Sequence, residues 1–220
     1  MKKLLILFVA VSVTSATMAQ SEKYVKAMEQ NIIALDTTTS LNGWRDLGNA
    51  FQRIADAEKT QWLPYYYAAF SHVMTGYMIA GANGGMGGFA AQTDPEADQA
   101  EKLLNKAVEL GKENSEIFCI RKMISSLRLM ADPMNRYQTE LPLATEYLNK
   151  AKTLDPGNPR VPLLEAQDKF YTPEQYGGSK SEAKVLFEES MKKYEAFKPE
   201  SSIHPQWGKS QVQYFLSQLK

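Results

Sequence analysis

Residues 144–154 read ATEYLNKAKTL and run directly into DPGNP at residues 155–159. This stretch places Ala144 and Ala151 seven positions apart, with Leu148 between them. Seven residues make two helical turns, so both alanines lie on one face and allow a second helix to approach closely, while the leucine fills the remaining space. The stretch therefore predicts a helix that packs tightly against a neighbour and ends at a proline-containing turn.

The same pattern occurs at other places in the chain. Residues 100–110 (AEKLLNKAVEL) repeat the two alanines, the leucine four positions after the first alanine and the final leucine. A weaker copy spans residues 183–194, with Ser190 in place of the second alanine. A helical unit that recurs along the chain indicates a helical-repeat protein.

These residues resemble the second helix and closing turn of a tetratricopeptide repeat (TPR). The resemblance implies an all-α fold, a right-handed α-solenoid of about four helix pairs over residues 21–198, with a C-terminal capping helix at 206–219. The spacing departs from the family, because Ala107 and Ala151 are 44 residues apart and the usual repeat is about 34 residues. We therefore expect extra residues in the connections between helices.

The rest of the chain also favours helices, since no segment shows the sustained alternation that is typical of strands. We expect nine helices, near residues 22–35, 41–58, 62–80, 94–110, 114–131, 139–154, 159–171, 180–197 and 206–219. Asp94 is the expected N-cap of the fourth. Three long connections remain, at residues 81–93, 132–138 and 172–179. In a solenoid they project from one edge, either as a functional side or as neutral loop drift.

The N-terminus has the order of a secretory signal peptide. Lys2 and Lys3 precede an apolar run at residues 4–13, and small residues follow up to Ala19. The run is about half of the roughly 20 residues that span a bilayer, which argues against a retained membrane anchor. We expect residues 1–19 to be removed, leaving residues 20–220 as one exported domain, periplasmic or secreted. The junction between Ala19 and Gln20 resembles those of exported proteins of the Bacteroidota.

Composition argues against several classes of function. Lys plus Arg and Asp plus Glu number 25 each, so no global charge favours nucleic acid or an anionic membrane. One cysteine and two histidines, His72 and His204, leave little material for a metal site. No common catalytic motif is present, and the glycine-rich residues 84–88 match no phosphate-binding spacing. We expect no catalysis, no cofactor and no metal site.

The resemblance to TPR proteins also suggests where a partner would bind. In that family the first helix of each pair lines a concave groove that receives extended peptides. Three tyrosines of the third expected helix are candidates for such contacts, Tyr65, Tyr66 and Tyr77. Arg121 and Arg128 lie seven residues apart on one face of the fifth expected helix and could hold a peptide carboxylate.

Three functions remain open from the sequence. The first is a non-catalytic scaffold that binds protein or peptide partners in the cell envelope. The second is a ligand-binding accessory of an envelope transport system, because the turn at residues 176–178 (YGG) is similar to one in helical periplasmic transport components. An unrecognised enzyme is the third. A closed pocket for a small molecule favours the second, whereas an open groove favours the scaffold.

Overall fold

A computed structural model describes residues 22–219 of the chain, and this part is all α-helical, with no strand. The predicted signal peptide lies outside the described residues. The helices are α1 (Glu22–Leu35), α2 (Leu41–Glu58), α3 (Trp62–Ala82), α4 (Ala90–Gly111), α5 (Ser115–Ala131), α6 (Pro133–Leu154), α7 (Arg160–Tyr171), α8 (Lys180–Ala196) and α9 (Lys209–Gln218), with a 3₁₀ turn η1 (Glu174–Tyr176). Within residues 22–219, no helix combines the length and apolar character needed to cross a membrane.

Side-chain caps explain where several helices begin. Ser40, Asn114 and Ser179 each accept a hydrogen bond from a backbone N–H in the first turn of α2, α5 and α8. Asp132 does the same for α6, where Pro133 occupies the first helical position. The helix starts that depend on these caps follow from local sequence chemistry.

Two of the three predicted long connections are wrong, because α4 and α6 begin earlier than expected. The connection predicted at 81–93 shrinks to residues 83–89, and the one at 132–138 shrinks to Asp132 alone. Asp94 is not an N-cap, since Pro95 lies inside α4. The Asp94 carboxylate instead forms a bidentate ion pair with the Arg136 guanidinium, with both N–O distances at 2.7 Å. This pair joins the first turns of α4 and α6.

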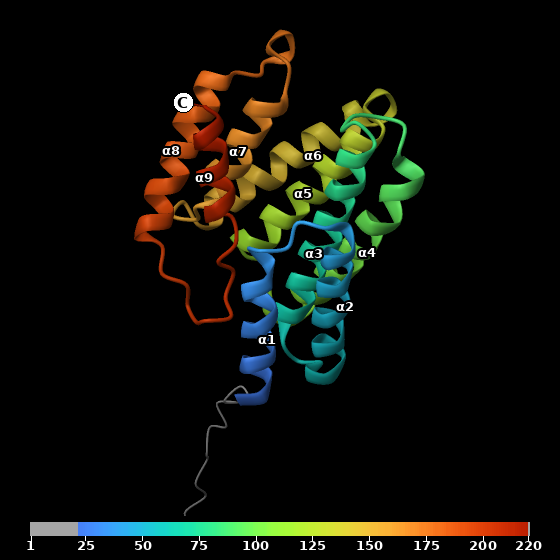
Figure 1. The fold of residues 1–220 in the computed structure, drawn as a ribbon, viewed down its shortest axis with the longest axis vertical. Helices are drawn as coiled ribbons and strands as arrows, with labels where there is room; N and C mark the ends of the chain where they lie inside the picture. The colour runs from blue at the N-terminus through green and yellow to red at the C-terminus, as the bar shows by residue number, and fades with distance from the viewer. Residues whose placement is uncertain (1–21, 220) are drawn as a thin grey trace, which may run out of the picture.

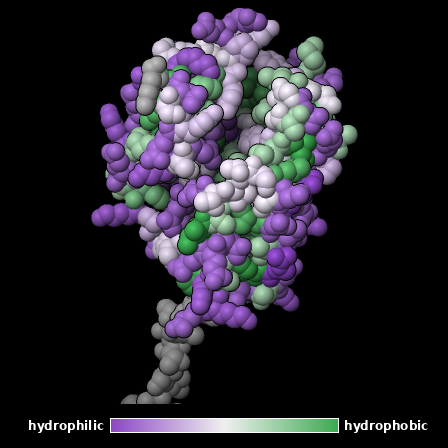
Figure 2. Space-filling model, viewed as in Figure 1, coloured by the Kyte–Doolittle hydropathy of each residue, from purple (hydrophilic) through white to green (hydrophobic). Residues whose placement is uncertain are grey.

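The helices pack mainly on their neighbours in the chain, as Figure 1 shows. The most extensive helix contacts are those of α3 with α4, α5 with α6, and α2 with α3, whereas α6 and α7 touch only over a short length. In the space-filling view of Figure 2, the surface is hollowed in the upper half of this face, where Figure 1 shows α6 and α7 diverging. α6 is thus covered mainly by α5.

The small residues that defined the repeat lie at the helix contacts. Ala100, Ala107 and Ala151 have no exposed surface, and Leu104 between the first two is equally buried. The Ser115 hydroxyl donates to the carbonyl oxygen of Ala151 at 2.8 Å, which fixes the start of α5 against the end of α6. The close approach expected from the repeated alanines is present at both copies.

The glycine-rich connection is anchored rather than loose. Gly84, Gly85, Gly87 and Gly88 all have φ between 76° and 87°, a region that side chains disfavour. The N–H groups of Gly87 and Gly88 donate to the last carbonyls of α5, those of Met130 and Ala131. This connection therefore lies beside the start of α6, at the end of the molecule that also carries the α7–α8 connection (Figure 1).

A segment between α8 and α9, which we call the strap (residues 197–208), packs back onto α3. Ile203 and Trp207 of the strap are buried, and the Trp207 ring stacks on Phe70 with 4.5 Å between centroids. The Tyr67 hydroxyl donates to the Ile203 carbonyl, and the Trp207 indole N–H donates to the Tyr66 hydroxyl. The strap ties the last tenth of the chain to α3.

Candidate functional site

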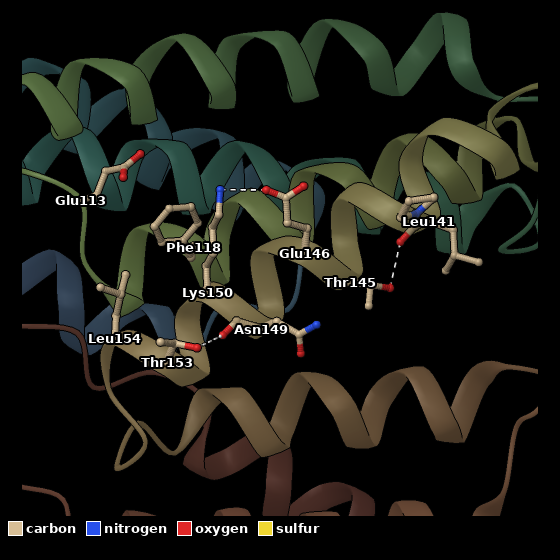
Figure 3. A pocket seen from close by; sticks show the side chains of 10 residues that line it. Glu113, Phe118, Leu141, Thr145, Glu146, Asn149, Lys150, Thr153 and Leu154 are labelled. Carbon is tan, nitrogen blue, oxygen red and sulfur yellow. Dashed lines mark hydrogen bonds and ion pairs between the residues drawn. The ribbon is translucent and has the colours of Figure 1, made fainter.

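An open and largely apolar groove with a volume of about 790 Å³ runs along α6. We call it the α6 groove. It is lined by Glu113 from the α4–α5 turn, Phe118 from α5, and Leu141, Pro142, Thr145, Glu146, Asn149, Lys150, Thr153 and Leu154 from α6. Figure 3 shows these side chains along the helix.

The position of the groove follows from how α6 is packed. Only Ala144, Leu148 and Ala151 of this helix are buried, and they form one narrow stripe. Leu141 and Leu154 flank this stripe on its two sides, at 37% and 52% of full exposure. Their exposed apolar surface in a concave groove makes this a candidate ligand site.

Two of the polar side chains in the groove donate their hydrogen bonds to their own helix rather than to a ligand. The Thr145 hydroxyl donates to the carbonyl of Leu141, and the Thr153 hydroxyl donates to the carbonyl of Asn149, each at 2.9 Å (Figure 3). Both donors are therefore satisfied within the helix. Apolar contact is the main interaction that this wall offers.

One cation lies in the groove, Lys150. Its ammonium nitrogen is 2.8 Å from a carboxylate oxygen of Glu146 and 5.5 Å from the centre of the Phe118 ring (Figure 3). The hydrogen bond to Glu146 raises the pKa of the Lys150 ammonium. The contact with the ring holds the charge at the floor of the groove.

The preceding copy of the repeat forms an equivalent groove of about 740 Å³ with opposite character, here called the α4 groove. Tyr65 is the fourth residue of α3, as Phe118 is of α5, and each lines its own groove. Adding 44 to the α4 positions gives the α6 positions. The α4 groove is lined by Gln52, Asp56, Tyr65, Asp98, Gln99, Glu101, Lys102, Leu103, Asn105, Lys106 and Glu109.

This comparison shows what distinguishes the α6 groove. Asp98, Glu101 and Glu109 of the α4 groove are matched by Pro142, Thr145 and Thr153. The α4 groove thus presents four carboxylates against two lysines, whereas the α6 groove presents two against one. Of two geometrically similar grooves, only the α6 groove suits an apolar ligand.

The prediction of Tyr66 as a partner contact is wrong. Its side chain has no exposed surface. Its hydroxyl donates to a carboxylate oxygen of Glu116 at 3.0 Å and accepts from Trp207 at 2.8 Å. Burial, and secondarily the Glu116 charge, raises the pKa of Tyr66 well above its ordinary value. Tyr66 therefore faces the strap, which fills the side of α3 where a peptide was expected.

The other two tyrosines do not gather at one site. Tyr65 is half-buried in the α4 groove, where its hydroxyl donates to the Ala55 carbonyl at 3.3 Å. Tyr77 is largely covered, and its hydroxyl donates to the Met123 carbonyl at 3.0 Å. Both phenols already have partners within the fold, and neither lines the α6 groove.

The two predicted arginines are engaged with α4. Arg128 binds the carboxylates of Asp98 and Glu101 at 2.7 and 2.8 Å. Burial opposes this charge, but the two hydrogen bonds raise the pKa of Arg128. Arg121 donates to the Asn105 side-chain oxygen at 3.0 Å. The Arg128 guanidinium is therefore occupied by carboxylates of the fold, whereas Arg121 has a neutral partner, and neither arginine lines the α6 groove.

The remaining candidates for chemistry also have internal partners. His72 pairs with Glu96 at 2.6 Å, and His204 pairs with Glu200 at 3.0 Å. Cys119 is buried, and burial raises the pKa of its thiol well above the ordinary value. Within the described residues, no cluster of His, Cys, Asp and Glu side chains has the form of a metal site.

Comparison with known proteins identifies one near neighbour. The HusA haemophore from Porphyromonas gingivalis superposes with a TM-score of 0.75 and 32% sequence identity, over 92% of this chain and 96% of that chain. No protein-family model matches the sequence, and no curated protein does.

Proposed function

Because the chain belongs to the same family as the HusA haemophore, we propose that it binds haem and carries it outside the cytoplasm. The observation that supports this most is the similarity itself, which extends over nearly the whole of both chains. Of the functions left open by the sequence, this is the ligand-binding one, and it replaces the peptide scaffold as the leading hypothesis.

We infer that the α6 groove is the haem site. Haem is a flat, largely apolar ring with two carboxylates on one edge. The groove offers the exposed apolar side chains of Leu141 and Pro142 near one end and of Leu154 near the other, and its volume of about 790 Å³ is ample for a molecule of this size. The two grooves differ little in net charge, because Arg128 pairs with Asp98 and Glu101 of the α4 groove, so the assignment rests on the more apolar lining of the α6 groove.

Three finer proposals accompany this function. The succession of neighbouring helix contacts from α1 to α8 supports a TPR-like solenoid, with α9 as its cap. Export rests on the predicted signal peptide at residues 1–19. Binding without catalysis agrees with a groove in which Thr145 and Thr153 bond to their own helix and Lys150 pairs with Glu146.

The test of the haem site places a charge on its apolar rim. We expect Leu141→Glu and Leu154→Glu each to weaken haemin binding by about tenfold or more, since a carboxylate at either position removes apolar contact and repels the ligand. The measurement is a Soret-band titration of residues 20–220 with haemin. Both side chains are already partly exposed, so folding should change little.

Matched controls add the same charge elsewhere. Ile33→Glu on α1 and Val185→Glu on α8 replace side chains that are 72% and 64% exposed. These variants should bind haemin as the parent protein does. Equal losses in both sets would place the ligand outside the α6 groove, and no saturable binding by the parent protein would refute haem binding altogether.

A second prediction concerns the iron. None of the ten side chains that line the groove is His, Cys, Met or Tyr, the usual axial ligands of haem. We therefore expect metal-free protoporphyrin to bind with an affinity within about threefold of that of haemin, as measured by quenching of tryptophan fluorescence. A loss of more than about tenfold without iron would show that a ligand to the metal lies elsewhere in the chain.

A further inference from the structure

We propose that Lys150 selects for a carboxylate on the ligand, so that the α6 groove binds a porphyrin acid in one orientation, with one carboxylate at Lys150 and the apolar edge toward Leu141 and Pro142. This inference rests on the proposed haem-binding function and deepens it. It distinguishes the end of the α6 groove that would bind a ligand carboxylate from the end that would not.

The charged side chains of the groove are not spread evenly between its two ends. At the start of its α6 wall stand Leu141 and Pro142, which offer no charge. Toward the other end lie Lys150 and Glu113, together with Thr153 and the apolar Leu154. The only cation of the lining thus stands toward this second end, so a ligand carboxylate can be paired there and not beside Leu141 and Pro142.

Lys150 is the sole cation among the ten lining residues, and the fold holds it in place. Glu146, one turn earlier on α6, binds its ammonium at 2.8 Å, and the Phe118 ring lies beneath it at 5.5 Å. The ring belongs to α5 and is only 3% exposed, so it is a rigid support. The Lys150 side chain is half-exposed, so its charge is available to a ligand in the groove.

The corresponding lysine in the α4 groove is held differently. Lys106 pairs with Glu109, one turn later on its helix, at 2.7 Å. At the position of Glu109 the α6 groove has Thr153, so Lys150 turns instead toward Glu146. Lys106 is therefore a matched control: the same residue, at the same repeat position, in a groove that we do not expect to bind porphyrin.

Glu146 has a defined role in this arrangement. It neutralises Lys150 in the empty groove and competes with the ligand carboxylate for the same ammonium. Removing its charge should strengthen binding of the acid, because the lysine then has no partner of its own. Replacement by glutamine keeps the size of the side chain, and Glu146 is exposed, so the fold should be preserved.

The experiment compares protoporphyrin with its dimethyl ester, which has the same ring and no carboxylate charge. We expect the parent protein to bind the acid about three- to tenfold more tightly than the ester, a range that suits one partly exposed charge-assisted hydrogen bond. Lys150→Met should abolish this preference, Lys106→Met should keep it, and Glu146→Gln should increase it. Affinities are measured by fluorescence quenching under identical solvent conditions.

The outcomes separate this inference from the function on which it rests. Equal binding of acid and ester by the parent protein, or a preference that survives Lys150→Met, would overturn the role of Lys150 and leave porphyrin binding intact. Failure of both ligands to bind would overturn the proposed function together with it. A preference that disappears in Lys150→Met alone supports the inference.

Discussion

Arg160→Met should destabilise the protein by about 3–5 kcal/mol, because it leaves a buried carboxylate without its counter-charge. Arg160 has no exposed surface. Its guanidinium donates to a Glu116 carboxylate oxygen at 2.9 Å and lies 5.1 Å from the Trp207 ring and 5.2 Å from the Phe197 ring. The residue thus joins α5, α7 and the strap at one point.

The electrostatics of the pair explain the size of the effect. Burial raises the pKa of Glu116, and the Arg160 charge acts against this shift. Asn158 and Tyr66 also donate to the same carboxylate, at 2.7 and 3.0 Å. Without the arginine, these neutral donors cannot replace the lost charge, so Glu116 must either take up a proton or remain charged in an apolar setting.

The measurement is urea denaturation of Arg160→Met, Glu116→Gln and the double variant. We expect the double variant to be more stable than the sum of the single changes predicts, since removing both charges leaves neither one unpaired. Simple additivity would contradict the idea that the two side chains act as a unit. Losses below about 1 kcal/mol in both single variants would show that the interior there is hydrated.

Ala107→Arg and Ala151→Arg should each cost about 4 kcal/mol or more, the second large effect that we expect. Both alanines are completely buried at the helix contacts described above. A long side chain there must either force the helices apart or bury an unpaired charge. The measurement is again the free energy of unfolding in urea, with circular dichroism to show whether the variant still folds.

Ala91→Arg is the control for these changes. It makes the same substitution on α4 at an exposed position. Its effect should lie within about 0.5 kcal/mol of zero. If Ala107→Arg or Ala151→Arg were equally harmless, the repeated alanines would not be the points of closest helix approach.

The helical architecture could be predicted from sequence because its signals are local. The alanine spacing of the repeat and caps such as Ser40 and Asn114 depend on residues a few positions apart. The start of α6 was missed although its cap, Asp132, is local, and the start of α4 has no side-chain cap that could have marked it. The prediction of Asp94 as a cap was wrong because its actual partner, Arg136, lies 42 positions away. The ion pair of Asp94 could therefore not be predicted from the residues around Asp94 alone.

The candidate site was missed for a different reason. The aromatic residues of α3 drew attention, but aromatic side chains on an apolar helix indicate burial as readily as binding, and Tyr66 is buried. The useful signal was the difference between copies of the repeat at exposed positions. Three acids of the first copy become Pro142, Thr145 and Thr153 in the second, a change that packing does not require.

The strap has a consequence for how the protein folds. Helices that contact only their neighbours in the chain can form stepwise, and any part can open without the rest. The hydrogen bonds from Tyr67 to Ile203 and from Trp207 to Tyr66 span 136 and 141 positions. They close the chain into a loop, so the last residues to emerge during synthesis or export complete the core around α3. The molecule should therefore unfold in a single cooperative transition, and a chain cut before residue 197 should lose that cooperativity.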